Sequence, residues 1–138
     1  MILEELLGKT INNIEINKDN NEIYFYLFNG AVYKQYHDQD CCENVNIEDI
    51  NGDLDDLIGS PLLQAEEVTQ NDTNAKDSAT WTFYKFATRK GYVTIRWYGE
   101  SNGYYSETAC IVKIKNENIK VERSNKLKRI DINTKYNF

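Results

Sequence analysis

The sequence has few of the residues on which catalysis depends, and it has no long apolar run. His37 is its only histidine, and there is no Gly-x-Ser-x-Gly elbow, phosphate-binding glycine loop or dinucleotide fingerprint. No segment approaches the roughly 18 apolar residues that span a bilayer, and the first residues lack the basic and apolar regions of a signal peptide. We therefore expect a cytoplasmic protein that is not an enzyme.

The cysteines are too few and too unevenly placed for a disulfide framework. Cys41 and Cys42 are adjacent, and Cys110 is remote from both. Adjacent residues of an extended strand point to opposite faces, so we expect no bond between Cys41 and Cys42. The three cysteines are therefore expected to be reduced thiols, with one of the adjacent pair buried.

Two clusters of potential ligands have the wrong spacing for a metal ion. The segment His37–Glu43 contains imidazole, carboxylate and thiol groups, but a zinc site needs paired ligands at defined separations. Asp53, Asp55 and Asp56 invite a calcium site, but the loop lacks the glycine and the final glutamate of an EF-hand. We predict no metal site and no cofactor.

Basic residues are absent between Asp38 and Glu67, a stretch that holds ten acidic residues. Residues 1–112 contain 8 basic and 19 acidic side chains, a balance of −11, whereas residues 113–138 contain 8 basic and 3 acidic ones, a balance of +5. We expect one acidic domain at 1–112 and a basic C-terminal extension at 113–138. The acidic field would repel nucleic acid and attract a basic partner.

Local patterns predict a helix, a strand and a hairpin at the start of the chain. Apolar residues at helical spacing in 2–7 are followed by a glycine, which suits the position just after a helix. Alternation at 14–16 predicts a strand with one buried face. A run of aromatic and β-branched residues, 23–36, is interrupted by Asn29-Gly30, which favours a hairpin with a type I′ turn.

The acidic middle of the chain predicts short elements separated by polar connections. Strands are expected at 45–47 and 62–68, and a polar loop at 70–78. One or two helical turns are expected at 53–59, with Asp53 as the N-cap and a terminal glycine.

The strongest β pattern follows the polar loop. Three strands, 79–88, 92–98 and 104–114, are expected to form an antiparallel meander. With the hairpin they predict an α+β fold, mainly antiparallel sheet, with one or two short helices. Alternation predicts a core face made of five residues, Trp81, Phe83, Val93, Ile95 and Trp97.

Arg96 lies on the opposite face of its strand, together with Tyr92 and Tyr98. A guanidinium flanked by tyrosines can hold an anion or stack on an aromatic ring. The alternative is a salt bridge from Arg96 to a cross-strand carboxylate such as Glu107.

Two long stretches resemble an uncharacterised domain family of bacteriophage and prophage proteins. The first is His37–Glu43 with Ile47–Leu54, and the second is Thr80–Lys85 with Gly91–Glu107. The resemblance covers most of residues 10–112 and brings no established activity. It implies a small phage-encoded protein in the cytoplasm of a bacterial host, where proteins of this kind resemble inhibitors of host defence, including anti-CRISPR proteins.

Our leading hypothesis is a non-enzymatic inhibitor that binds a basic, nucleic-acid-handling host protein, such as a nuclease effector, through its acidic surface. Carboxylates on a rigid scaffold can take the place of backbone phosphates and steer association. The expected partner-binding residues are Asp38, Asp40, Glu43, Glu48, Asp49, Asp53, Asp55 and Asp56.

The alternative hypothesis is a small-molecule binder that sequesters a nucleotide signal of the defence system. Its ligand site would use the aromatic face around the arginine, and it allows for a homo-oligomer with the site at the interface. The expected ligand-binding residues are Tyr92, Arg96, Tyr98 and Tyr104. Neither hypothesis involves direct binding of nucleic acid by the acidic domain or binding to a membrane.

Overall fold

The protein is a sandwich of two four-stranded antiparallel sheets, seen in a computed structural model that describes residues 2–118. One sheet has the strand order β1-β2-β3-β8 and the other the order β4-β7-β6-β5. The elements are α1 (Ile2–Leu6), β1 (Ile11–Ile16), β2 (Glu22–Leu27), β3 (Val32–Tyr36), β4 (Asn44–Asn51), the 3₁₀ helix η1 (Leu54–Leu57), β5 (Gln64–Asn71), β6 (Ser78–Thr88), β7 (Gly91–Ser101) and β8 (Cys110–Lys115).

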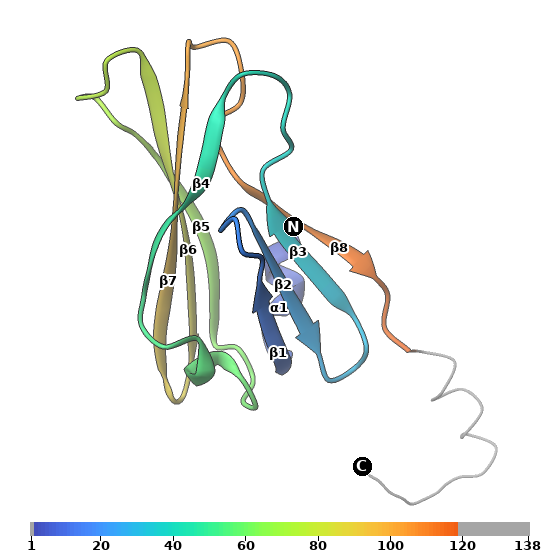
Figure 1. Cartoon of the computed structure of the whole chain (residues 1–138). Helices are drawn as coiled ribbons and strands as arrows, with labels where there is room; N and C mark the ends of the chain where they lie inside the picture. Colours follow the sequence, from blue (N-terminus) through green and yellow to red (C-terminus); the bar gives the residue numbers. More distant parts are fainter. Residues whose placement is uncertain (1, 119–138) are drawn as a thin grey trace, which may run out of the picture.

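The two sheets face each other and enclose the core between them (Figure 1). The rings of Phe25 on β2 and Phe86 on β6 lie 5.6 Å apart between their centroids. The indole Nε1 of Trp97 on β7 donates a 2.6 Å hydrogen bond to Oε1 of Gln35 on β3, and both side chains are fully buried. Inward-facing residues of both sheets therefore form one continuous core.

The fold is largely β rather than α+β. Antiparallel pairing, the opening helix and the 3₁₀ turn at 54–57 agree with the sequence-based expectation. Asp53 caps that turn, since its Oδ1 accepts a 3.0 Å hydrogen bond from the Asp55 backbone N–H. The region described contains no helix of the length and apolarity needed to cross a membrane.

The predicted meander is wrong in its third strand. β8 pairs with β3 in the opposite sheet, and the meander consists of β5, β6 and β7. After β7 the chain crosses from one sheet to the other, and the backbone of Glu107 passes over Gly99. Hydrophobic alternation reports strands but not their partners, so the sequence could not reveal this crossing.

Gly99 is required at the crossing because a side chain there has no room. A Cβ atom on Gly99 would lie 2.1 Å from the backbone oxygen of Glu107. We expect Gly99→Ala to lower the free energy of unfolding by about 1 to 3 kcal/mol, because the backbone must shift. Urea unfolding measures this, with Glu100→Ala at the exposed neighbouring position as the control. An unchanged midpoint for Gly99→Ala would contradict the crossing.

The predicted register holds for β7 and fails for β6. Val93, Ile95 and Trp97 are fully buried, as expected. Trp81 and Phe83, predicted in the core, instead lie opposite Tyr98 and Arg96 on the outer face of the sheet. The core positions of β6 belong to Thr82, Tyr84 and Phe86. Both faces of β6 carry aromatic residues, so alternation alone could not distinguish them.

The β2–β3 hairpin is confirmed, but its turn is not the expected one. Gly30 has φ of 94°, whereas Asn29 is not at positive φ, so a type I′ turn does not form. Instead, the Asn29 side chain accepts a 2.9 Å hydrogen bond from the Ala31 N–H. Of the predicted basic extension, residues 113–115 belong to β8, and 119–138 lie outside the described residues.

Candidate binding site at the loop end

Three connections meet at one end of the sandwich, at the top of Figure 1. They are 37–43 between β3 and β4, 72–77 between β5 and β6, and 102–109 between β7 and β8. We call these three segments the loop end. Loops clustered at one end of a β-sandwich are a common place for a binding site, because the sheets hold them rigidly.

A cavity of about 360 Å³ lies between the three segments of the loop end. Cys42 contributes from the first segment, Lys76 and Asp77 from the second, and Asn102 and Tyr105 from the third. Its lining is mostly polar and comes from residues far apart in sequence. A second hollow of about 400 Å³ lies between the residues around 37–40 and 106–110.

The first segment of the loop end is held by a buried contact between His37 and Glu43. Nε2 of His37 lies 2.7 Å from Oε2 of Glu43, and Nδ1 of His37 lies 2.8 Å from the Thr108 backbone oxygen. Glu43 also accepts hydrogen bonds from the backbone N–H groups of Asp40 and Cys41. Both ring nitrogens of His37 are therefore engaged, one by Glu43 of the first segment and one by the backbone of the third.

The pKa of Glu43 is strongly lowered by this arrangement. Burial opposes ionisation, but the hydrogen bonds from His37 and from the backbone of Asp40 and Cys41 outweigh it and lower the pKa to about 2. Glu43 is therefore ionised at neutral pH and ties the first segment to the third through His37.

The other two segments are anchored by carboxylates as well. Glu107 accepts hydrogen bonds from the hydroxyls of Thr80, at 2.7 Å, and Ser101. Burial works against ionisation of Glu107, but these hydrogen bonds keep its pKa below the usual value. Asp72 accepts a 2.6 Å hydrogen bond from the Tyr98 hydroxyl, which lowers the pKa of Asp72 and raises that of Tyr98 to about 12.

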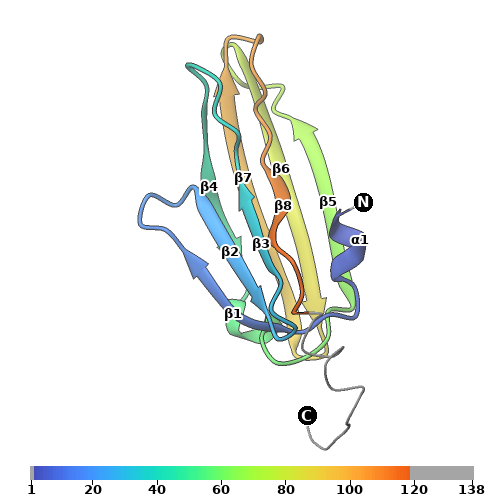
Figure 2. The same ribbon diagram turned by 90° about the vertical axis from the view of Figure 1, so that its right-hand side faces the viewer.

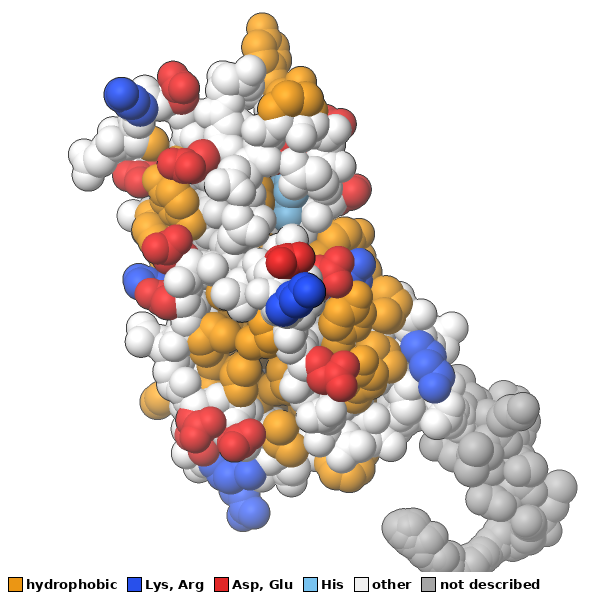
Figure 3. Space-filling view, viewed as in Figure 1, with side chains coloured by type: hydrophobic (Ala, Val, Ile, Leu, Met, Phe, Trp, Pro, Cys, Tyr) orange, Lys and Arg blue, Asp and Glu red, His pale blue; other side chains and the backbone are white. Residues whose placement is uncertain are grey.

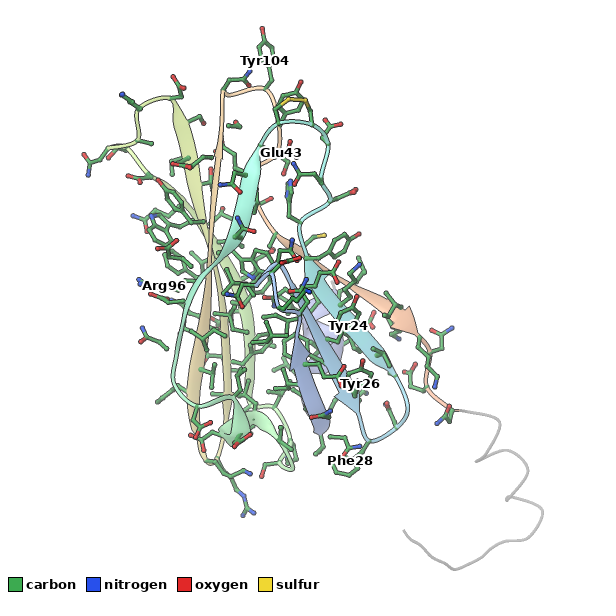
Figure 4. The ribbon with its side chains drawn as sticks, in the orientation of Figure 1. Tyr24, Tyr26, Phe28, Glu43, Arg96 and Tyr104 are labelled. Atoms are coloured by element: carbon green, nitrogen blue, oxygen red, sulfur yellow. A yellow bond between two sulfur atoms is a disulfide. The ribbon has the colours of Figure 1, made fainter. Side chains whose placement is uncertain are left out.

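Acidic side chains lie at the loop end, beside Lys76, as well as elsewhere on this face (Figure 3). Four exposed carboxylates belong to it or adjoin it, namely Asp38, Asp40, Asp77 and Glu100. Within residues 2–118, none of the four forms an ion pair with a lysine or arginine. Tyr104 projects from the tip, with 86% of its surface exposed (Figure 4). This end thus offers negative charge and an aromatic anchor to a partner.

The predicted acidic surface is divided by the fold. Asp38 and Asp40 lie at the loop end, whereas Asp53, Asp55 and Asp56 lie around η1 at the opposite end. Glu48 and Asp49 lie between them on the edge strand β4, and Asp49 is already paired with Arg96. The eight residues therefore do not form one contiguous surface.

The prediction of the partner-binding residues is wrong for Glu43. It was expected on the binding surface, but its side chain is buried and holds the loop from within. Conversely, Asp77 and Glu100 were not predicted as binding residues, because nothing in the sequence shows which hairpin ends are neighbours. The length and polarity of the loop at 70–78 were the available signal.

The four residues of the alternative ligand site are also separated. Tyr92, 78% exposed, and Tyr104 lie near opposite ends of the molecule. Arg96 donates from Nε to Oδ1 of Asp49 at 2.6 Å and from Nη2 to Oδ2. This edge of the guanidinium is therefore already hydrogen-bonded to a carboxylate. The predicted salt bridge from Arg96 to a cross-strand carboxylate is confirmed, but the partner is Asp49 of β4, which lies directly opposite, and not Glu107.

Aromatic rings surround Arg96 on the outer face of its sheet. Its Cζ lies 5.3 Å from the Trp81 ring centroid, and Trp81 packs against Phe83 and Tyr98 at 6.0 and 4.6 Å between centroids. Arg96 is thus held on both sides, by a ring and by a carboxylate. An anionic ligand would have to displace Asp49.

The cysteines differ from the sequence-based expectation. The Sγ atoms of Cys41 and Cys42 are bonded to each other, and both residues are exposed. The prediction assumed an extended strand, whereas this segment bends, which brings both side chains to one side. Cys110 is a free thiol whose pKa is raised by burial. Among residues 2–118, no group of three or more histidine, cysteine or acidic residues could hold a metal ion.

A family model described as a domain of unknown function (DUF7448) matches residues 4–111. Neither a curated protein nor a solved structure matches the chain.

Proposed function

The chain belongs to the DUF7448 family of domains of unknown function. We propose that it is a non-enzymatic protein that binds a basic partner through its loop end. The observation that carries this proposal is the convergence of three anchored loops that present unpaired carboxylates and an exposed tyrosine.

The rigidity of the loop end supports binding at low entropic cost. Each segment is held by a buried or partly buried carboxylate, so little freedom remains to be lost when a partner binds. Tyrosine at the tip supplies contact area with only two side-chain torsions to fix. Serine, asparagine and glycine beside Tyr104 give this segment the composition of many binding loops.

The partner we propose is a protein that handles nucleic acid. Asp38 and Asp40 on one side of the loop end and Asp77 and Glu100 on the other present negative charge, as a phosphate backbone does to a basic groove. Inhibition would follow from occupation of that groove. We propose that the protein is phage-encoded and inhibits host defence in the bacterial cytoplasm.

The alternative function, sequestration of a nucleotide by the face around Arg96, has less geometric support. The guanidinium is engaged by Asp49, and Tyr104 lies far from it at the tip of the molecule (Figure 4).

Charge reversal at the loop end tests the proposal. The immobilised full chain is used to capture proteins from bacterial lysate, and the association rate of each captured protein is then measured. We expect Asp38→Lys with Asp40→Lys to slow association by about tenfold. Duplex DNA should compete with capture, and rising salt should weaken it.

The matched control is Asp55→Lys with Asp56→Lys, which makes the same double charge reversal at the opposite end of the sandwich. It should bind as the unmodified chain does. Binding that is independent of salt, unaffected by reversal at Asp38 and Asp40, and abolished by Arg96→Ala would reject the loop end and favour the aromatic face.

A further inference from the structure

The edge of β5 differs from the other sheet edges of the protein. The four edge strands that residues 2–118 form are β1, β8, β4 and β5. The ladders of β1, β8 and β4 each contain a register shift, whereas β5 pairs with β6 without interruption over its eight residues. Bulges, lysines and prolines are the usual means of preventing unwanted pairing at an edge.

The residues of β5 do not protect its edge. Gln64–Asn71 contains no lysine, arginine, proline or glycine, and positions 66–71 are exposed. By comparison, β8 carries Lys113 and Lys115, and the backbone N–H of Ile47 on β4 donates to Asn20 of the β1–β2 turn. Figure 2 shows β5 at the margin of its sheet with α1 beside it, and within residues 2–118 no backbone hydrogen bond joins α1 to β5.

Every second residue of β5 directs its backbone N–H and C=O groups away from β6. Asp72 N–H donates to the Ala79 oxygen at 2.9 Å, at the end of the β5–β6 ladder. Because bonded pairs alternate in an antiparallel ladder, Val68 and Gln70 direct their N–H and C=O groups toward β6. Glu67 and Thr69 therefore direct theirs away from the sheet, where a further strand can pair.

The edge is complementary to itself in one antiparallel register. If two copies pair with Val68 opposite Val68, then Glu67 lies opposite Thr69 and Glu66 opposite Gln70. No like charges face each other, and the free backbone groups of Glu67 and Thr69 bond to those of the partner. Val68, 41% exposed on one chain, is then covered by its own counterpart.

We propose that two copies of this chain pair along β5 to form a dimer with one continuous eight-stranded sheet across a two-fold axis. The outer-face row that runs from Phe83 to Val68 continues into Val68 and Phe83 of the second copy. The two strands run antiparallel, so the two loop ends point in opposite directions. If the proposed function is correct, the dimer is bivalent.

Thr69→Pro tests the pairing directly. Proline removes the outward N–H of Thr69 but no bond to β6, and it is tolerated on an edge strand. The control, Thr69→Ala, keeps the N–H. By analytical ultracentrifugation of the full chain we expect a dimer with a Kd below about 100 µM, raised at least about tenfold by Thr69→Pro and unchanged by Thr69→Ala.

A second variant keeps the test valid if the proline disturbs folding. Val68→Asp places like charges at the two-fold axis and should also dissociate the dimer. A chain that sediments as a monomer at about 500 µM would overturn the proposal, as would a dimer that neither variant weakens. These measurements need no binding partner, so their failure is distinct from failure of the proposed function.

The register is tested by oxidative cross-linking in a Cys110→Ser background. Val68→Cys should form an intermolecular disulfide, because opposite residues at the axis bring their Cα atoms within bonding range. Glu66→Cys, on the same face, should not, because its position faces Gln70. Cross-linking through position 66 but not 68 would overturn the proposed pairing.

Discussion

Trp97→Ala is expected to lower the free energy of unfolding by about 3 to 5 kcal/mol. The indole is fully buried between the two sheets, and its loss creates a large cavity. The substitution also removes the donor to Oε1 of Gln35, a fully buried side chain whose Nε2 has no partner in the described region. Neither the carbonyl oxygen nor the NH₂ group of the Gln35 side-chain amide would then have a hydrogen-bond partner in the described region.

Two variants separate the contributions of Trp97. Trp97→Phe retains most of the volume and loses the hydrogen bond, so it should cost about 1 to 3 kcal/mol. Tyr92→Ala on the same strand, at an exposed position, should change stability by less than about 0.5 kcal/mol. Urea unfolding of all three measures the differences. Equal effects for Trp97→Ala and Tyr92→Ala would contradict the assigned register of β7.

Glu43→Ala is expected to lower the melting temperature by about 10 °C or more. It leaves the His37 ring and the backbone N–H groups of Asp40 and Cys41 without their acceptor. Hydrogen exchange should show faster exchange of the amides of Asp40 and Cys41, while the core strands stay protected. Asp40→Ala, an exposed neighbour, is the matched control and should leave both measurements unchanged.

The same carboxylate predicts how stability depends on pH. The folded-state pKa of Glu43, about 2, is below its usual value of 4.5, so the unfolded chain binds the proton more readily. The stabilisation is therefore complete above about pH 5 and is lost as the pH falls from 4.5 toward 2. Melting curves between these values should show a steeper loss for the unmodified chain than for Glu43→Gln. Parallel curves would contradict the role of Glu43.

In the candidate site, contacts between residues distant in sequence differ most from the sequence-based expectation. The two ring nitrogens of His37, a potential metal ligand by residue type, contact Glu43 and the Thr108 backbone. Arg96 was correctly placed on the outer face, and its carboxylate partner was misidentified. In both cases the residue types were informative, but they did not identify a partner distant in sequence, namely Thr108 for His37 and Asp49 for Arg96.

The sequence by itself determined the local structure of this protein. Hydrophobic alternation located the strands, the aspartate at position 53 marked the start of η1, and the β7 residues Val93, Ile95 and Trp97 were correctly assigned to the core. These features depend on neighbours within a few residues, and the physical rules that govern them act over the same range.

Only the tertiary structure decided which strands pair and which loops meet. The passage of Glu107 over Gly99 carries β8 to the opposite sheet, and this crossing brings segment 102–109 beside 37–43. It also buries Glu43 beneath the loop and separates Asp38 from Asp55 by the length of the sandwich. Pairing between distant strands is decided by the free energy of the whole core, and no local pattern of residues records that choice.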